Sequence, residues 1–119
     1  MKVKIVGVIG KGDFGKETVT MQVLEDCDIV KYVIFDNTYK NNGNISDKYR
    51  HSYWFPSKKV KAGDVVTLLT QTGKNTETKL PDGTPVHMFY WNLREAVWND
   101  DGDIAVLLEI ADGQAFHVK

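Results

Sequence analysis

Hydrophobic and polar residues alternate with a period of two along most of this chain. Residues 17–24 show the alternation most cleanly, and their apolar side consists of Val19, Met21 and Val23. This pattern predicts a strand with one face buried and the other in water. Comparable alternation, or β-branched and aromatic composition, predicts seven further strands: residues 2–9, 29–35, 49–55, 65–70, 86–92, 104–110 and 114–118.

Turn-forming residues separate these segments. Residues 36–47 are dense in Asn, Asp and Gly, and residues 73–85 are polar with two prolines, so both stretches are predicted to be loops. The pair Asp112-Gly113 predicts a hairpin that leads the chain into the last strand. Because no long stretch has helical periodicity, each sheet must pack on another sheet or close on itself. The pattern therefore predicts an all-β sandwich or barrel of about eight short antiparallel strands.

A tryptophan, a tight turn and an apolar strand follow one another near the C-terminus. Trp98 precedes the run from Asn99 to Asp103, and the next strand places Ile104, Val106, Leu108 and Ile110 on one side. We expect this side to be buried and the Trp98 ring to enter the core, which removes ~150–250 Å² from water.

Residues 98–107, WNDDGDIAVL, are similar to the Trp-Asn-Asn-x-Gly-Asp-x-Ala-x-Leu signature of the lamin tail domain family. Asp112-Gly113 falls where that family has its next Asp-Gly. Residues 17–21, ETVTM, resemble the family's first conserved strand, and Phe55-Pro56 followed by Ala62-Gly63 resembles its Phe-Pro and Pro-Gly. The chain departs from the family at Lys31-Tyr32, where Gly-Trp is usual, and at Ala62, where proline is usual.

The resemblance implies an immunoglobulin-like β-sandwich formed as a single domain by residues 1–119. It implies that Trp98, Asn99, Gly102 and Asp103 form a structural motif and that the domain is a non-catalytic binding or assembly module.

Composition and charge narrow the class of protein further. The chain has 119 residues, 42% of them hydrophobic and 26% charged, with a formal net charge of −1. These values are typical of one globular domain and exclude a nucleic-acid footprint from bulk charge. The single cysteine, Cys27, lies between Asp26 and Asp28, and we expect both carboxylates to raise the pKa of its thiol. No apolar run approaches the ~20 residues of a spanning helix, so we expect no membrane insertion and a cytoplasmic protein, although loss of an export signal would leave the same sequence.

Catalytic and metal-binding motifs are absent from the sequence. No nucleophile motif, phosphate loop or dinucleotide-binding turn occurs, so we expect neither enzymatic activity nor a cofactor. His51, His87 and His117 lack metal-ligand spacing, which predicts histidines at the surface or at strand ends and no metal. Calcium binding by the carboxylates between Asn99 and Asp103 stays open as an alternative to a plain turn.

Two aromatic segments and one basic cluster are the candidate binding residues. The candidates are Tyr53, Trp54, Phe55, Phe89, Tyr90 and Trp91, with Lys58, Lys59 and Lys61. Strand alternation places Tyr53 and Phe55 on one side and Trp54 on the other, so one set must belong to the core. We expect the partner to be a protein, a second copy of the chain included. The alternatives are a nucleic-acid-binding β-barrel that uses the lysines with nearby rings, and a small metal-dependent hydrolase without a recognisable motif.

Overall fold

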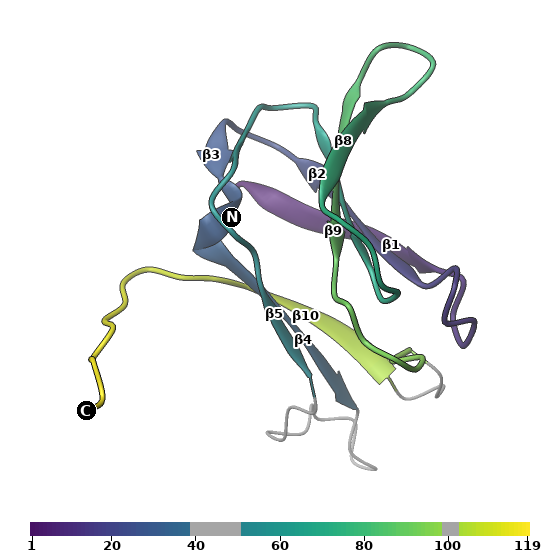
Figure 1. Cartoon of the computed structure of the whole chain (residues 1–119). Helices are drawn as coiled ribbons and strands as arrows, with labels where there is room; N and C mark the ends of the chain where they lie inside the picture. Colours follow the sequence, from purple (N-terminus) through teal and green to yellow (C-terminus); the bar gives the residue numbers. More distant parts are fainter. Residues whose placement is uncertain (39–50, 99–102) are drawn as a thin grey trace.

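A computed structural model describes residues 1–38, 51–98 and 103–119 of the chain. The regular secondary structure of this part is almost entirely β, which confirms the predicted fold class (Figure 1). Its ten strands form three sheets, and the only helical element among them is a single 3₁₀ turn, η1 (Ile29–Lys31). No helix in the described part is long and apolar enough to cross a lipid bilayer.

The largest sheet has five strands in the order β1-β2-β7-β9-β8. They are β1 (Val3–Ile9), β2 (Thr18–Val23), β7 (Val65–Leu69), β9 (Pro85–Tyr90) and β8 (Thr76–Lys79). Neighbours are antiparallel except β7 and β9, which are parallel, so the prediction of a wholly antiparallel sandwich is wrong at this pair. The reason is that β8 forms the outer edge and the chain returns as β9 between β8 and β7. The predicted loop 73–85 therefore contains a strand, whose four residues are all exposed and carry no apolar signal.

The second sheet has three strands in the order β10-β4-β5, and a two-stranded sheet pairs β3 with β6. The strands are β10 (Asp103–Glu109), β4 (Tyr32–Thr38), β5 (Ser52–Trp54), β3 (Cys27–Asp28) and β6 (Lys59–Val60). The predicted loops 36–47 and 99–103 lie largely outside the described residues, and the calcium alternative falls there with Asn99 and Gly102. Of these segments the structure describes residues 36–38, which belong to β4, and Asp103, which begins β10.

The hydrophobic core lies between the two larger sheets. Val19, Met21 and Val23 are all buried, as the alternation in β2 predicts. Trp98 is buried as well and packs in the same cluster, which confirms its expected place in the core. At about 25 cal/mol per Å², burying a ring of this size stabilises the fold by roughly 4–6 kcal/mol.

Two predictions about the C-terminal strands are wrong. The residues of β10 that pack against the core are Ala105 and Leu107, whereas Leu108 on the expected buried side is 43% exposed. The register explains this, since Leu107 pairs with the buried Ile34 of β4. Residues 114–118 also form no strand, because the chain passes the Asp112-Gly113 pair without reversing and runs away from the sheets (Figure 1).

Candidate binding groove

Strand β5 and the residue that follows it, Phe55, present their aromatic side chains on two opposite faces. Tyr53 is half-buried and Phe55 fully buried, whereas the side chain between them, Trp54, is 66% exposed. The predicted alternation is therefore present, and the core side is the one that carries Tyr53 and Phe55.

Most of the predicted aromatic contact residues pack against one another inside the protein. Tyr53 and Phe55 form an edge-to-face pair with ring centroids 5.0 Å apart, and Phe55 pairs with Phe89 at 5.1 Å. Trp91 packs at the side of this group, and its ring centroid lies 6.1 Å from that of Tyr53 and 6.2 Å from that of Trp98. Offset and edge-to-face pairs of this kind stabilise a core beyond the area they bury. These four predicted residues are consequently parts of the core or its margin.

The Trp54 indole is exposed but has a fixed orientation. Its Nε1–H donates a hydrogen bond of 2.7 Å to the carbonyl oxygen of Val30 in η1. That turn is held by Asp28, whose carboxylate accepts the Val30 N–H. The same carboxylate accepts the Lys58 N–H and the Ser57 hydroxyl, which follow β5 in the chain.

Asp28 thus joins η1 to the segment after β5. Burial alone would raise the pKa of its carboxyl, but the hydrogen bonds from Ser57, Val30 and Lys58 hold that pKa below its ordinary value. The carboxyl is ionised at neutral pH and keeps its three donors.

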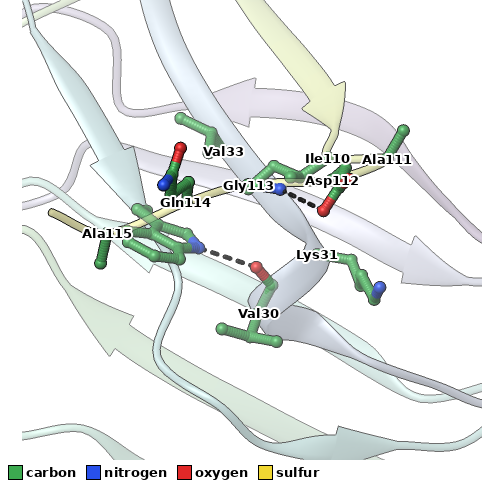
Figure 2. A pocket seen from close by; sticks show the side chains of 10 residues that line it. Val30, Lys31, Val33, Ile110, Ala111, Asp112, Gly113, Gln114 and Ala115 are labelled. Carbon is green, nitrogen blue, oxygen red and sulfur yellow. Dashed lines mark hydrogen bonds between the residues drawn. The ribbon is translucent and has the colours of Figure 1, made fainter.

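A groove with a volume of about 600 Å³ opens beside Trp54 (Figure 2). Val30, Lys31 and Val33 line it together with the segment from Ile110 to Ala115, which passes over it after β10. Apart from Lys31, Asp112 and Gln114, its side chains are apolar. Trp54 was a candidate from the sequence, but the other walls of the groove were not. The alternation in β4 could have indicated one of these walls, because it places Val33 on the side of the strand opposite the buried Ile34.

The groove continues an apolar row on the outer face of the three-stranded sheet. The strand registers pair Leu108 of β10 with Val33 of β4, and Val33 with Trp54 of β5. Directly paired residues of antiparallel strands lie on the same face of a sheet. The face opposite the core therefore carries a large aliphatic, a β-branched and an aromatic side chain in one line.

The basic cluster lies elsewhere and alternates with carboxylates. Lys58 forms an ion pair of 3.2 Å with Glu77, and Lys59 pairs with Asp28 in the β3–β6 ladder. The backbone N–H of Lys61 donates to Asp64. A surface on which positive and negative charges alternate at such short distances does not provide the continuous positively charged groove that binds a nucleic acid backbone.

Tyr90 is half-buried and contributes to a different part of the surface. Its ring lies directly over Gly73, and its backbone N–H donates to the side chain of Asn75. It is therefore not part of the Trp54 groove.

Each histidine has a separate environment. His51 contacts the buried Asp36 at 3.1 Å, and His87 contacts Asp64 at 2.8 Å. The prediction of a surface or strand-end position is wrong for His87, which is buried in the middle of β9, where Asp64 satisfies its ring. His117 is exposed in the C-terminal segment. Among the residues that the structure describes, no group of three His, Cys, Asp or Glu side chains could hold a metal ion.

The Cys27 thiol has a raised pKa, as expected from its sequence neighbours, but burial is the largest cause and the charges of Asp28 and Asp26 add to it. A thiol that is harder to ionise is a poorer nucleophile.

No protein-family model matches the chain, and no curated protein matches it.

Proposed function

We propose that this chain is a non-catalytic binding module, akin in type to a lamin tail domain, and that it binds an apolar or aromatic side chain of a partner protein in the groove beside Trp54. The observation that carries the proposal is the state of Trp54 itself: the indole is 66% exposed, yet its Nε1–H is fixed on the Val30 carbonyl. A ring whose orientation is already set loses little conformational entropy when a partner covers it.

The surroundings of the indole support a protein partner. Tryptophan is enriched among the residues that dominate protein interfaces, and such residues lie in pockets that become fully desolvated. The groove of about 600 Å³ has the size of a typical ligand site and is lined mainly by apolar side chains. Lys31 at its margin can pair with an acidic residue of the partner.

Selection from a displayed library of random peptides tests the proposal. We expect peptides selected on the wild-type protein to bind the Trp54→Ser variant at least about tenfold more weakly, which is the effect of a central interface residue. The Tyr90→Ser variant is the matched control, because Tyr90 is a half-buried aromatic residue outside the groove. Its binding should stay within about twofold of the wild type.

The nucleic-acid alternative predicts a different result. Under that alternative, a fluorescein-labelled oligothymidine would bind in a salt-dependent manner, and the Lys59→Gln and Lys61→Gln substitutions would weaken it. Such binding, together with peptides that are insensitive to Trp54→Ser or with no selected peptides at all, would contradict the proposed function.

A further inference from the structure

Strand β10 is an edge strand of the three-stranded sheet. Within the described part of the chain its one ladder partner is β4. The Ile110 N–H donates to the Lys31 carbonyl on the β4 side, and backbone groups alternate in direction along an antiparallel strand. The N–H and C=O groups of Ala105, Leu107 and Glu109 therefore point away from β4. An exposed row of such groups is a template for a further strand.

Between this edge of β10 and strand β1 runs a seam, by which we mean the line where the two sheets meet, and side chains do not fill it completely. A hollow of about 100 Å³ lies at one end, lined by Val8, Trp98 and Ala105 among others. A second hollow of about 280 Å³ lies at the other end, beside Tyr32 and Glu109. Val8 pairs with the buried Val19, which places it on the core side of β1, yet it is 36% exposed and lines the first hollow.

The C-terminal segment has the complementary features. Residues 114–119 have the alternating pattern of a strand, yet they pair with nothing in the described structure. Phe116 and Val118 lie on the same side of an extended chain, and they are 83% and 85% exposed.

The segment does not reach its own β10 edge. A two-residue hairpin turn at Asp112-Gly113 would require positive φ at both residues in type I′ or at Asp112 in type II′. Neither residue has a positive φ, and the chain runs outward after β10 (Figure 1).

We propose that residues 116–118 add as a strand to the open β10 edge of a second copy of this chain, so that two copies exchange their C-terminal ends while residues 110–115 stay beside Trp54. The register is the one that the Asp112-Gly113 turn would set within one chain, which pairs Phe116 with Glu109 and Val118 with Leu107. Leu107 packs against the core, so both apolar side chains turn toward the seam beside β1. Reciprocal exchange gives a closed dimer with twofold symmetry.

Disulfide trapping between copies tests this register. In a Cys27→Ser background, one copy carries Leu108→Cys and the other His117→Cys. These residues are opposite each other at a pair without mutual hydrogen bonds, where Cα atoms approach to about 4.5 Å and a disulfide fits. We expect the mixture to form the cross-linked dimer under mild oxidation. Val118→Cys in place of His117→Cys is the control, because its side chain lies on the other face and should not cross-link.

Two further measurements complete the test. In sedimentation at increasing concentration, the Phe116→Ser/Val118→Ser protein should dissociate at least about tenfold more readily than the wild type. A chain that carries both Leu108→Cys and His117→Cys and closes its disulfide within the monomer would overturn the proposal, as would failure of the mixture to cross-link. Trp54→Ser should leave the cross-link intact, so that this result and the peptide-binding result are independent.

Discussion

The Nε2 atom of His87 lies 2.8 Å from Oδ2 of Asp64, and both side chains are buried. The other ring nitrogen, Nδ1, lies 3.3 Å from Oε1 of Glu77. Asp64 immediately precedes β7, His87 lies in β9 and Glu77 in β8. The contact between Asp64 and His87 therefore joins the start of β7 to β9, whereas Nδ1 of His87 forms no hydrogen bond within the described residues and faces Glu77 of the exposed outer strand β8.

The Asp64 carboxyl should make stability depend on pH in the acid range. Burial alone would raise its pKa, but hydrogen bonds from the Lys61 amide and His87, with the charges of both residues, hold that pKa below its ordinary value of 3.8. A carboxyl with a lowered folded pKa contributes stability that is complete above its unfolded pKa and lost as the pH falls through the folded value. We expect the free energy of unfolding in urea to decline below about pH 4.

The Asp64→Asn variant isolates this contribution. It should be about 1–3 kcal/mol less stable at pH 7, because His87 loses its charged partner. It should also show a shallower decline with acid. Asp112→Asn, which changes an exposed carboxyl, serves as the control and should follow the wild type. Identical acid slopes for the Asp64→Asn variant and the wild type would contradict the assignment.

Tyr32 should have the opposite pH behaviour. Its hydroxyl accepts the Lys2 N–H and donates to the Glu109 carboxylate, both at 2.8 Å. Burial, with the hydrogen bond to Glu109, raises the pKa of Tyr32 to about 12. Because the folded pKa lies above the unfolded value of 10.0, this contribution is complete below pH 10 and is lost as the pH rises through about 12.

Substitution of Tyr32 by phenylalanine checks this sign. The variant should lose about 0.5–1.5 kcal/mol at pH 7 and should show less destabilisation between about pH 10 and 12 than the wild type. In an absorbance titration near 295 nm, the wild type should retain one late-ionising tyrosine that the variant lacks. A wild-type curve in which every tyrosine ionises together near pH 10 would refute the prediction.

Glu17 is a buried carboxylate that holds three distant segments together. Oε1 accepts the Thr70 hydroxyl and the Val97 N–H, and Oε2 accepts the Gly12 and Trp98 N–H groups, at distances of 2.8–3.0 Å. The side chain therefore fixes the segment that carries Trp98 into the core.

Even the isosteric Glu17→Gln change should be costly. An amide offers one acceptor oxygen, so in either orientation its NH₂ group faces at least one backbone N–H that is left without a partner in a buried position. We expect a loss of about 2–5 kcal/mol in the free energy of unfolding by chemical denaturation. Glu25→Gln, at an exposed site close in sequence, should change stability by less than about 0.5 kcal/mol. Equal stability of these two variants would show that Glu17 has no such role.

Local pattern was enough to predict part of this structure. The alternation in β2 and β5 and the burial of Trp98 could be predicted from neighbouring residues alone, and the structure confirms them. The side of β10 that meets the core could not be predicted in this way. Its buried side carries Ala105 and Leu107, whereas its outer side carries the larger set of apolar residues.

The binding groove and the role of Glu17 depend on contacts between distant segments. The groove joins η1, β4, β5 and residues 110–115, and no short stretch of sequence contains its walls. In the sequence, a glutamate just before a strand is typical of a solvent-exposed strand end. Only the four hydrogen-bond donors that converge on Glu17 in the structure show that its carboxylate is buried and joins distant segments. The relation to lamin tail domains and the single-domain organisation remain predictions.

Gly73 should tolerate no side chain while Tyr90 is present. A Cβ atom at position 73 would lie 2.5 Å from both Cδ1 and Cε1 of the Tyr90 ring, which is closer than real contacts allow. The two backbones cannot move apart freely, because the Tyr90 N–H donates to the Asn75 side chain and the Gly73 N–H donates to the Asn92 side chain, so the ring itself must move. We expect Gly73→Ala to lower the melting temperature and to reduce stability by about 1–3 kcal/mol.

Two further variants separate the clash at Gly73 from a general effect of adding a methyl group. Gly7→Ala is the matched control, since no other atom lies within 4 Å of the point that its Cβ would occupy, and it should melt close to the wild type. Gly73→Ala should cost less stability when it is added to the Tyr90→Ser variant than when it is added to the wild type, because the Tyr90→Ser variant has no ring to clash with the new methyl group. Additive effects of the two substitutions would show that the ring is not the obstacle.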